Sequence, residues 1–165
     1  MSIISFFKEA GEKLFGSKPA AAAATAPDAA ALQAQADAAN QTAATAITSY
    51  IKTQGLSVDG LDVSFDGASG AVTVAGETAD QATKEKVVLC CGNVHGVAQV
   101  NDMLVVREPA DESRYYTVVR GDTLSAISKA MYGNANQYPK IFEANKPMLS
   151  HPDKIYPGQL LRIPA

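Results

Sequence analysis

Cysteine is scarce in this sequence: the chain of 165 residues contains only Cys90 and Cys91, which are adjacent. Neighbouring side chains on a helix point about 100° apart, so this pair excludes a disulfide framework and favours a reducing compartment. The N-terminus has no basic segment ahead of an apolar run, and no apolar run approaches the length of a membrane-spanning helix. We therefore expect a cytoplasmic protein without stable membrane insertion.

Runs of basic residues with interleaved aromatic residues are also missing, which excludes nucleic acid as an expected partner. The net charge of −3 is unevenly distributed: residues 115–165 contain six Lys or Arg and three Asp or Glu, whereas the rest carries a net charge of −6. Two oppositely charged halves favour docking of one on the other. Nucleophile-elbow and phosphate-loop motifs are absent, so we expect a binding protein and no enzyme.

Two patterns of possible metal ligands are incomplete. Cys91 and His95 are four residues apart, but Gly92 interrupts a helix between them and no third or fourth zinc ligand follows nearby. Asp59, Asp62 and Asp66 lack the downstream glutamate of a calcium loop, and we interpret them as strand-edge and turn residues.

The N-terminal residues 1–16 have the apolar spacing of an amphipathic helix. Packing on a domain is the simpler interpretation, and a membrane-surface anchor is the alternative, although the charges are mixed in sign. Residues 17–40 form an alanine-rich linker. From Asp28 onward a capping residue precedes a proline-free run, so part of this linker is predicted to be helical.

Residues 41–106 predict the order helix, strand, strand, helix, strand. Two alternating segments flank the glycine-containing turn 66–70, as in a hairpin. Thr78 is the predicted cap of a helix that ends near Gly92, and the strand Val97–Val106 follows. The pattern Val72–Gly76 before this helix, and Gly92–Asp102 after it, resembles a BON domain.

Residues 107–114 are a predicted linker, and the strongest motif of the chain follows in 115–165. It runs as strand, Gly-Asp turn, helix, loop, helix, Pro-Gly turn and strand, with Asp122 or Thr123 capping the first helix. This segment resembles a LysM module. The expected fold class is therefore α+β, with two small domains, BON (αββαβ) and LysM (βααβ), and an N-terminal amphipathic helix.

LysM modules bind N-acetylglucosamine-containing glycans in a shallow groove, so the resemblance implies glycan as a candidate partner. Gly121 and the two turn residues Pro157 and Gly158 are as well explained by the fold alone. The positions implied for the groove are Gly121, Asp122, Thr123, Leu124, Pro147, Met148 and Ile155.

The predicted turn from Gly92 to Val97 has a chemical consequence of its own. A helix end leaves up to four carbonyl groups without intrahelical partners, at the negative end of the helix dipole, where a cation is favoured. A second such end is predicted near Phe7–Gly11. Both also fit a simple structural connection whose carbonyl groups bind water.

The whole arrangement resembles the small bacterial cytoplasmic potassium-binding proteins that combine a BON and a LysM domain. This resemblance implies K⁺ as the ligand, held by five backbone carbonyl groups: Phe7, Ala10, Gly92, Val94 and Val97. We expect a monomeric potassium sensor or buffer that becomes more compact with the ion. The alternatives are a cell-envelope glycan-binding protein and a membrane-associated BON adaptor.

Overall fold

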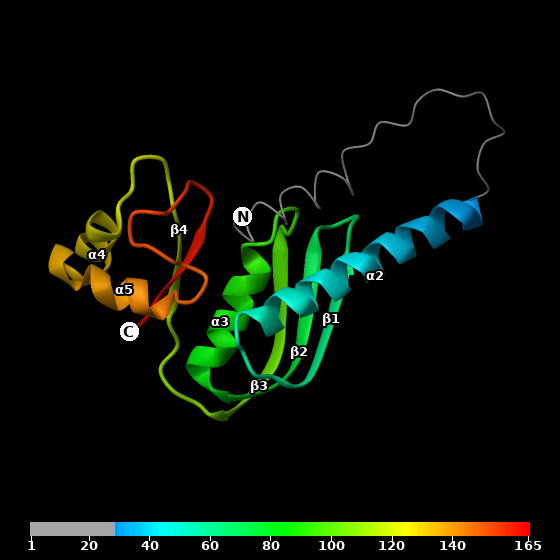
Figure 1. Cartoon of the computed structure of the whole chain (residues 1–165), viewed down its shortest axis with the longest axis horizontal. Helices are drawn as coiled ribbons and strands as arrows, with labels where there is room; N and C mark the ends of the chain where they lie inside the picture. The colour runs from blue at the N-terminus through cyan, green and yellow to red at the C-terminus, as the bar shows by residue number, and fades with distance from the viewer. Residues whose placement is uncertain (1–28) are drawn as a thin grey trace.

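The computed structural model describes residues 29–165, which begin with one long helix. Helix α2 spans Ala29–Thr53, so the helix predicted from Asp28 onward is continuous with the first helix predicted for residues 41–106. Only its second half is packed: residues 29–38 are exposed, whereas Ala44, Ile47 and Ile51 are buried. Their spacing of three and four residues places these side chains on one helix face. Figure 1 shows the first half of α2 projecting beyond the sheet.

A three-stranded sheet lies under this helix. Strand β1 (Asp59–Asp66) pairs antiparallel with β2 (Ala71–Asp80), and β2 pairs parallel with β3 (Gln99–Glu108), in the order β1-β2-β3. The predicted hairpin is confirmed, and β3 begins two residues after the predicted start. Alternating residues of the strands contribute Phe65, Val72, Val74 and Leu104 to a core shared with α2 and α3, which lie on one face of the sheet (Figure 1).

Helix α3 (Gln81–Gly92) forms the parallel crossover from β2 to β3. The prediction that Thr78 caps this helix is wrong: Thr78 continues β2, pairs with Val106 and is 1% exposed. Asp80 is the N-cap instead, and its Oδ1 accepts a hydrogen bond from the Thr83 N–H at 2.7 Å. Parallel pairing with β3 therefore carries the strand two residues beyond the local capping signal.

The second domain has the predicted order of elements. A two-stranded antiparallel sheet, β4 (Arg114–Thr117) and β5 (Leu160–Ile163), packs against two short helices. The helices are α4 (Leu124–Tyr132) and α5 (Tyr138–Ala144), with the 3₁₀ turn η1 (Ala135–Gln137) between them. Thr123 caps α4, since its hydroxyl accepts from the Ala126 N–H at 3.1 Å. Figure 1 shows this domain beside α3.

Candidate functional site

The C-terminal end of α3 is built differently from the glycine stop that the sequence predicted. Gly92 is the last helical residue and Asn93 is the C-cap, while the positive φ of +87° comes later, at Gly96. The Asn93 N–H donates to Leu89 O at 3.1 Å, and the Val94 N–H donates to Cys91 O at 3.2 Å. These bonds occupy the carbonyl groups of Leu89 and Cys91, whereas the carbonyl groups of Gly92 and of the residues beyond it belong to the turn that follows the helix.

Two of these carbonyl groups are held in place through their own peptide units. In a planar trans peptide the C=O and the following N–H point in opposite directions. The Gly92 carbonyl belongs to the unit whose N–H comes from Asn93 and is bonded back to Leu89. The Val97 carbonyl belongs to the unit of the Ala98 N–H, which donates to Gly70 O at 2.8 Å. Both carbonyl groups are thus oriented before any ligand arrives.

The third predicted carbonyl lies between them. Val94 O accepts a hydrogen bond from the Val97 N–H at 3.2 Å, which closes the turn and leaves one lone pair of that oxygen. Within residues 29–165 no hydrogen bond reaches the carbonyl oxygens of Gly92 or Val97. The structure therefore brings Gly92, Val94 and Val97 together in one turn. Phe7 and Ala10, the other two predicted ligands, lie outside the described residues.

This turn lines a cavity of about 640 Å³ between the two domains. The other walls are Tyr50 of α2 and two parts of the loop before β5, Met148 and 156–159. Among these described residues the lining contains no Asp, Glu, Lys or Arg side chain. Burial raises the pKa of Tyr50 to about 12, so its hydroxyl stays neutral at physiological pH. The cavity therefore offers neutral oxygen atoms and apolar surface.

The second domain contacts the same turn directly. The Asn93 side chain accepts from the Leu160 N–H through Oδ1 at 2.8 Å and donates to Leu160 O through Nδ2 at 2.9 Å. Gly92 lies so close to β5 that an added Cβ would be 3.0 Å from Leu160 Cδ2. Sequence reasoning selected Gly92 as a helix stop and missed this second reason for a residue without a side chain.

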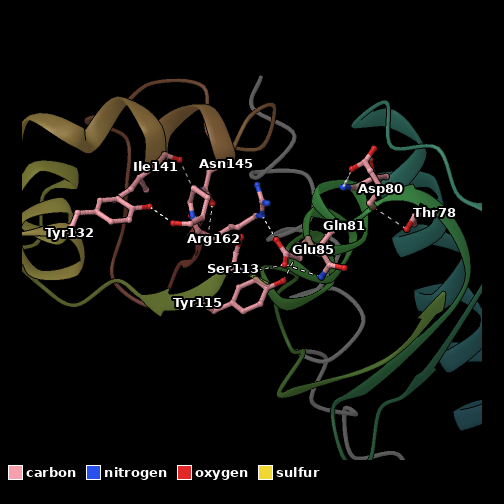
Figure 2. Close-up of polar contacts among 12 residues, drawn as sticks. Thr78, Asp80, Gln81, Glu85, Ser113, Tyr115, Tyr132, Ile141, Asn145 and Arg162 are labelled. Atoms are coloured by element: carbon pink, nitrogen blue, oxygen red, sulfur yellow. Dashed lines mark hydrogen bonds and ion pairs between the residues drawn. The ribbon is translucent and has the colours of Figure 1, made fainter. Parts of the chain in front are cut away.

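A buried ion pair joins the domains further along α3, as Figure 2 shows. Arg162 Nε lies 2.5 Å from Glu85 Oε2, with exposed side-chain fractions of 11% and 5%. Glu85 Oε1 also accepts from the Gln81 amide at 3.0 Å and from the Ser113 N–H at 2.8 Å. Burial alone would raise the pKa of Glu85, but these hydrogen bonds outweigh it and the pKa is lowered. The opposite charges of the two halves predicted docking, but no local pattern identified this pair.

A sulfur contact completes the interface. Met148, one of the predicted glycan-groove residues, packs against the BON core, with its Sδ 3.1 Å from Cys90 Sγ. Cys90 and Cys91 are free and fully buried, and burial raises the pKa of Cys91 to about 12. His95 is exposed, so it does not share a site with Cys91, and residues 29–165 contain no metal-binding group of His, Cys, Asp and Glu.

The three aspartates weighed as calcium ligands have no common site. Asp59 and Glu77 hold the Arg107 guanidinium. Asp66 closes the β1–β2 turn by accepting from Ser69 Oγ at 2.5 Å, and these turn bonds lower its pKa.

Most predicted glycan-groove positions have partners inside the chain. Leu124 is 3% exposed and belongs to the hydrophobic core of the second domain, and Ile155 packs against that core. Asp122 Oδ2 accepts from Tyr116 Oη and from the Val119 N–H, both at 2.9 Å. Gly121, with φ +93°, and Pro147 remain at the surface.

Comparison with known proteins agrees with this architecture. Residues 39–108 match the BON domain family and residues 116–164 match the LysM domain family. Over 164 residues, 99% of both chains, the sequence is 45% identical to the potassium binding protein Kbp of Escherichia coli.

This chain belongs to the Kbp family. A second relative, an uncharacterized protein of Deinococcus radiodurans, is 51% identical over 50 residues, which are 30% of this chain and 19% of that protein. Within residues 29–165, no helix is long and apolar enough to cross a membrane.

Proposed function

We propose that this chain is a cytoplasmic potassium-binding protein in which backbone carbonyl groups of Phe7, Ala10, Gly92, Val94 and Val97 hold the ion. The observation that carries the proposal is the turn after α3, where Gly92, Val94 and Val97 line one cavity and the carbonyl groups of Gly92 and Val97 are fixed by anchored peptide units. The name of the E. coli relative supports the choice of ion. The proposed role is binding without catalysis.

The chemistry of the cavity fits potassium better than a divalent ion. Ca²⁺ and Mg²⁺ sites use carboxylates, and the described lining has none. Rings of neutral carbonyl groups replace the hydration shell of K⁺ in channels, and helix C-terminal ends coordinate monovalent cations in transporters. The dipole of α3 adds roughly half a negative charge at this end of the helix.

The N-terminal segment would complete the site. Three carbonyl groups are fewer than K⁺ needs after losing its water, so Phe7 and Ala10 would supply further oxygen atoms. Because only the closed arrangement would bind the ion, K⁺ would shift the population toward a more compact monomer, as a sensor or buffer requires.

Calorimetry with K⁺ and then Na⁺, together with small-angle scattering, tests this proposal in the full chain. Saturable K⁺ binding with a smaller radius of gyration, and little response to Na⁺, is the expected result. No heat with K⁺ and an unchanged radius would refute it.

Two glycine substitutions locate the site. Gly96 (φ +87°) and Gly133 (φ +74°) both have left-handed backbones, and nothing lies within 4 Å of an added Cβ at either position. Alanine should therefore cost about 1–2 kcal/mol of strain at both. Gly96→Ala distorts the carbonyl turn and should weaken K⁺ binding, whereas the matched control Gly133→Ala, at the end of α4, should not. If the two variants bind K⁺ with equal affinity, the ion site is not at this turn.

Glycan binding by the LysM domain is the second candidate, favoured by the family match over residues 116–164. Titration with N-acetylglucosamine oligomers discriminates the two candidates. Binding of these oligomers, with shifts of the Gly121 and Thr123 amide signals in NMR, would support a glycan site. K⁺ binding without such shifts would leave LysM as a structural partner of BON.

A further inference from the structure

Asn93 makes hydrogen bonds in both domains. Its backbone N–H and its Nδ2 both donate to Leu89 O at 3.1 Å, which fastens the residue to the last turn of α3. Its side-chain amide also exchanges two hydrogen bonds with the N–H and C=O of Leu160. A neighbouring β-strand would make the same pair of bonds with a strand edge. The side chain therefore takes the place of one residue of a third strand beside β5.

Two asparagine side chains bond to the outer edge of β5: Asn93 to Leu160 and Asn145 to Arg162. Arg162 N donates to Asn145 Oδ1 and Arg162 O accepts from Asn145 Nδ2, both at 2.8 Å (Figure 2). Asn145 belongs to the same domain as β5, whereas Asn93 comes from the BON domain. Docking of the two domains therefore decides whether the Leu160 edge groups bond to protein or to water.

We propose that Asn93 is the positioning residue through which docking of LysM sets the carbonyl geometry of the ion site. The inference rests on the proposed potassium function. The N–H of Asn93 and the carbonyl of Gly92 form one rigid peptide unit, so a rotation of Asn93 turns the Gly92 oxygen with it. When β5 holds the side chain and Leu89 holds the backbone, that unit has one orientation.

Gly92 contributes to the same coupling through its lack of a side chain. An added Cβ would approach Leu160 Cδ2 to 3.0 Å, so any larger residue at position 92 would require the Leu160 side chain to shift. The ion site and the contact with β5 thus belong to one turn, at a cavity that both domains line. Binding free energies are reciprocal, so K⁺ strengthens docking by the same factor by which docking strengthens K⁺ binding.

The test compares Asn93→Leu with the matched control Asn101→Leu in the full chain. Leucine has a similar volume and removes both bonds to Leu160. Asn101 lies in the same domain on β3, where its side chain bonds to Gln99 and Thr73, away from β5. The expected result is K⁺ binding weaker on the order of tenfold in Asn93→Leu, a typical size for coupling between two sites, and unchanged in the control.

Amide hydrogen exchange is a second measurement, and it separates loss of the coupling from a general loss of stability. In the wild-type chain, K⁺ should slow exchange of the Leu160 amide, whose acceptor is Asn93. The Arg162 amide is the internal reference, because its acceptor Asn145 lies in the same domain. In Asn93→Leu the effect of K⁺ on the Leu160 amide should disappear.

The outcomes separate the two proposals. If wild-type protein binds K⁺ while the Leu160 amide exchanges equally fast with and without the ion, or if Asn93→Leu binds K⁺ like wild type, the coupling is wrong and the potassium function stands. If wild-type protein does not bind K⁺, the potassium function fails. Because the exchange comparison needs no variant, it remains decisive should Asn93→Leu not fold.

Discussion

Removing the arginine of the buried interdomain pair is the sharpest test of how the two domains are held together. Arg162→Met keeps much of the side-chain volume but leaves the Glu85 carboxylate 4% exposed, with only Gln81 and Ser113 as hydrogen-bond donors. Breaking one side of a buried ion pair typically costs about 3–5 kcal/mol. Here the domains can separate and hydrate the charge, so the docking free energy is the upper limit. We expect a loss of about 3 kcal/mol.

Urea unfolding and thermal unfolding measure this loss. For a chain of this length, about 1 kcal/mol corresponds to roughly 2–4 °C, so the melting temperature should fall by about 6–12 °C. The double variant Glu85→Leu, Arg162→Met buries no charge and should recover part of the loss, although the Ser113 N–H then lacks its acceptor. A single variant as stable as wild type, or a double variant that recovers nothing, would refute the electrostatic account.

The pH dependence of folding stability follows from the direction of the Glu85 pKa shift. The pKa of Glu85 is lowered from 4.5 in the folded chain, so its contribution is fully present above pH 4.5 and is lost as the pH falls through the folded value. Arg162→Met removes one cause of that shift. The stability difference between wild type and this variant should therefore narrow below pH 4.5, as measured by urea unfolding across pH 3–7 at constant ionic strength.

Three further predictions concern single positions. Asp80→Ala removes the cap of α3 and should cost about 1 kcal/mol in urea unfolding, while Thr83→Ala, which keeps the Asp80–backbone bond, should cost less. Cys90 and Cys91 should resist an aromatic disulfide reagent at pH 8 in the native chain and both react in urea, because the thiols are buried with raised pKa values; rapid native labelling would contradict this burial. Asn145→Leu removes a fully buried amide and leaves the Arg162 N–H and C=O without partners, and should lower stability by about 2–4 kcal/mol, with a loss under 1 kcal/mol contradicting the bonding described.

Local patterns predicted the elements well and their ends less well. Alternation and turn residues predicted the hairpin, and helical spacing predicted α3 and α4, because these signals act between residues a few positions apart. The cap of α3 was misplaced because both Thr78 and Asp80 are capping residues. Pairing of Thr78 with Val106 on a distant strand decided between them.

At the candidate site, too, local features could be predicted from the sequence and long-range contacts could not. From the sequence alone, a helix end at Gly92 followed by a turn to Val97 was accessible, since backbone groups at a helix end need partners whatever surrounds them. The choice of the Gly92, Val94 and Val97 carbonyl groups as ligands came from the resemblance to potassium-binding proteins. The role of Asn93 was not accessible, because its partner Leu160 is 67 residues away and an asparagine after a helix is ordinarily a cap.

The sequence by itself thus determined the two domains, their order and the turn that offers carbonyl oxygens, because periodicity and turn chemistry are properties of short segments. Only the tertiary structure decided that β5 lies against this turn, that Glu85 meets Arg162, and that Gly92 packs against Leu160. Contacts between residues far apart in the chain depend on how two finished surfaces fit, and no local propensity encodes that fit.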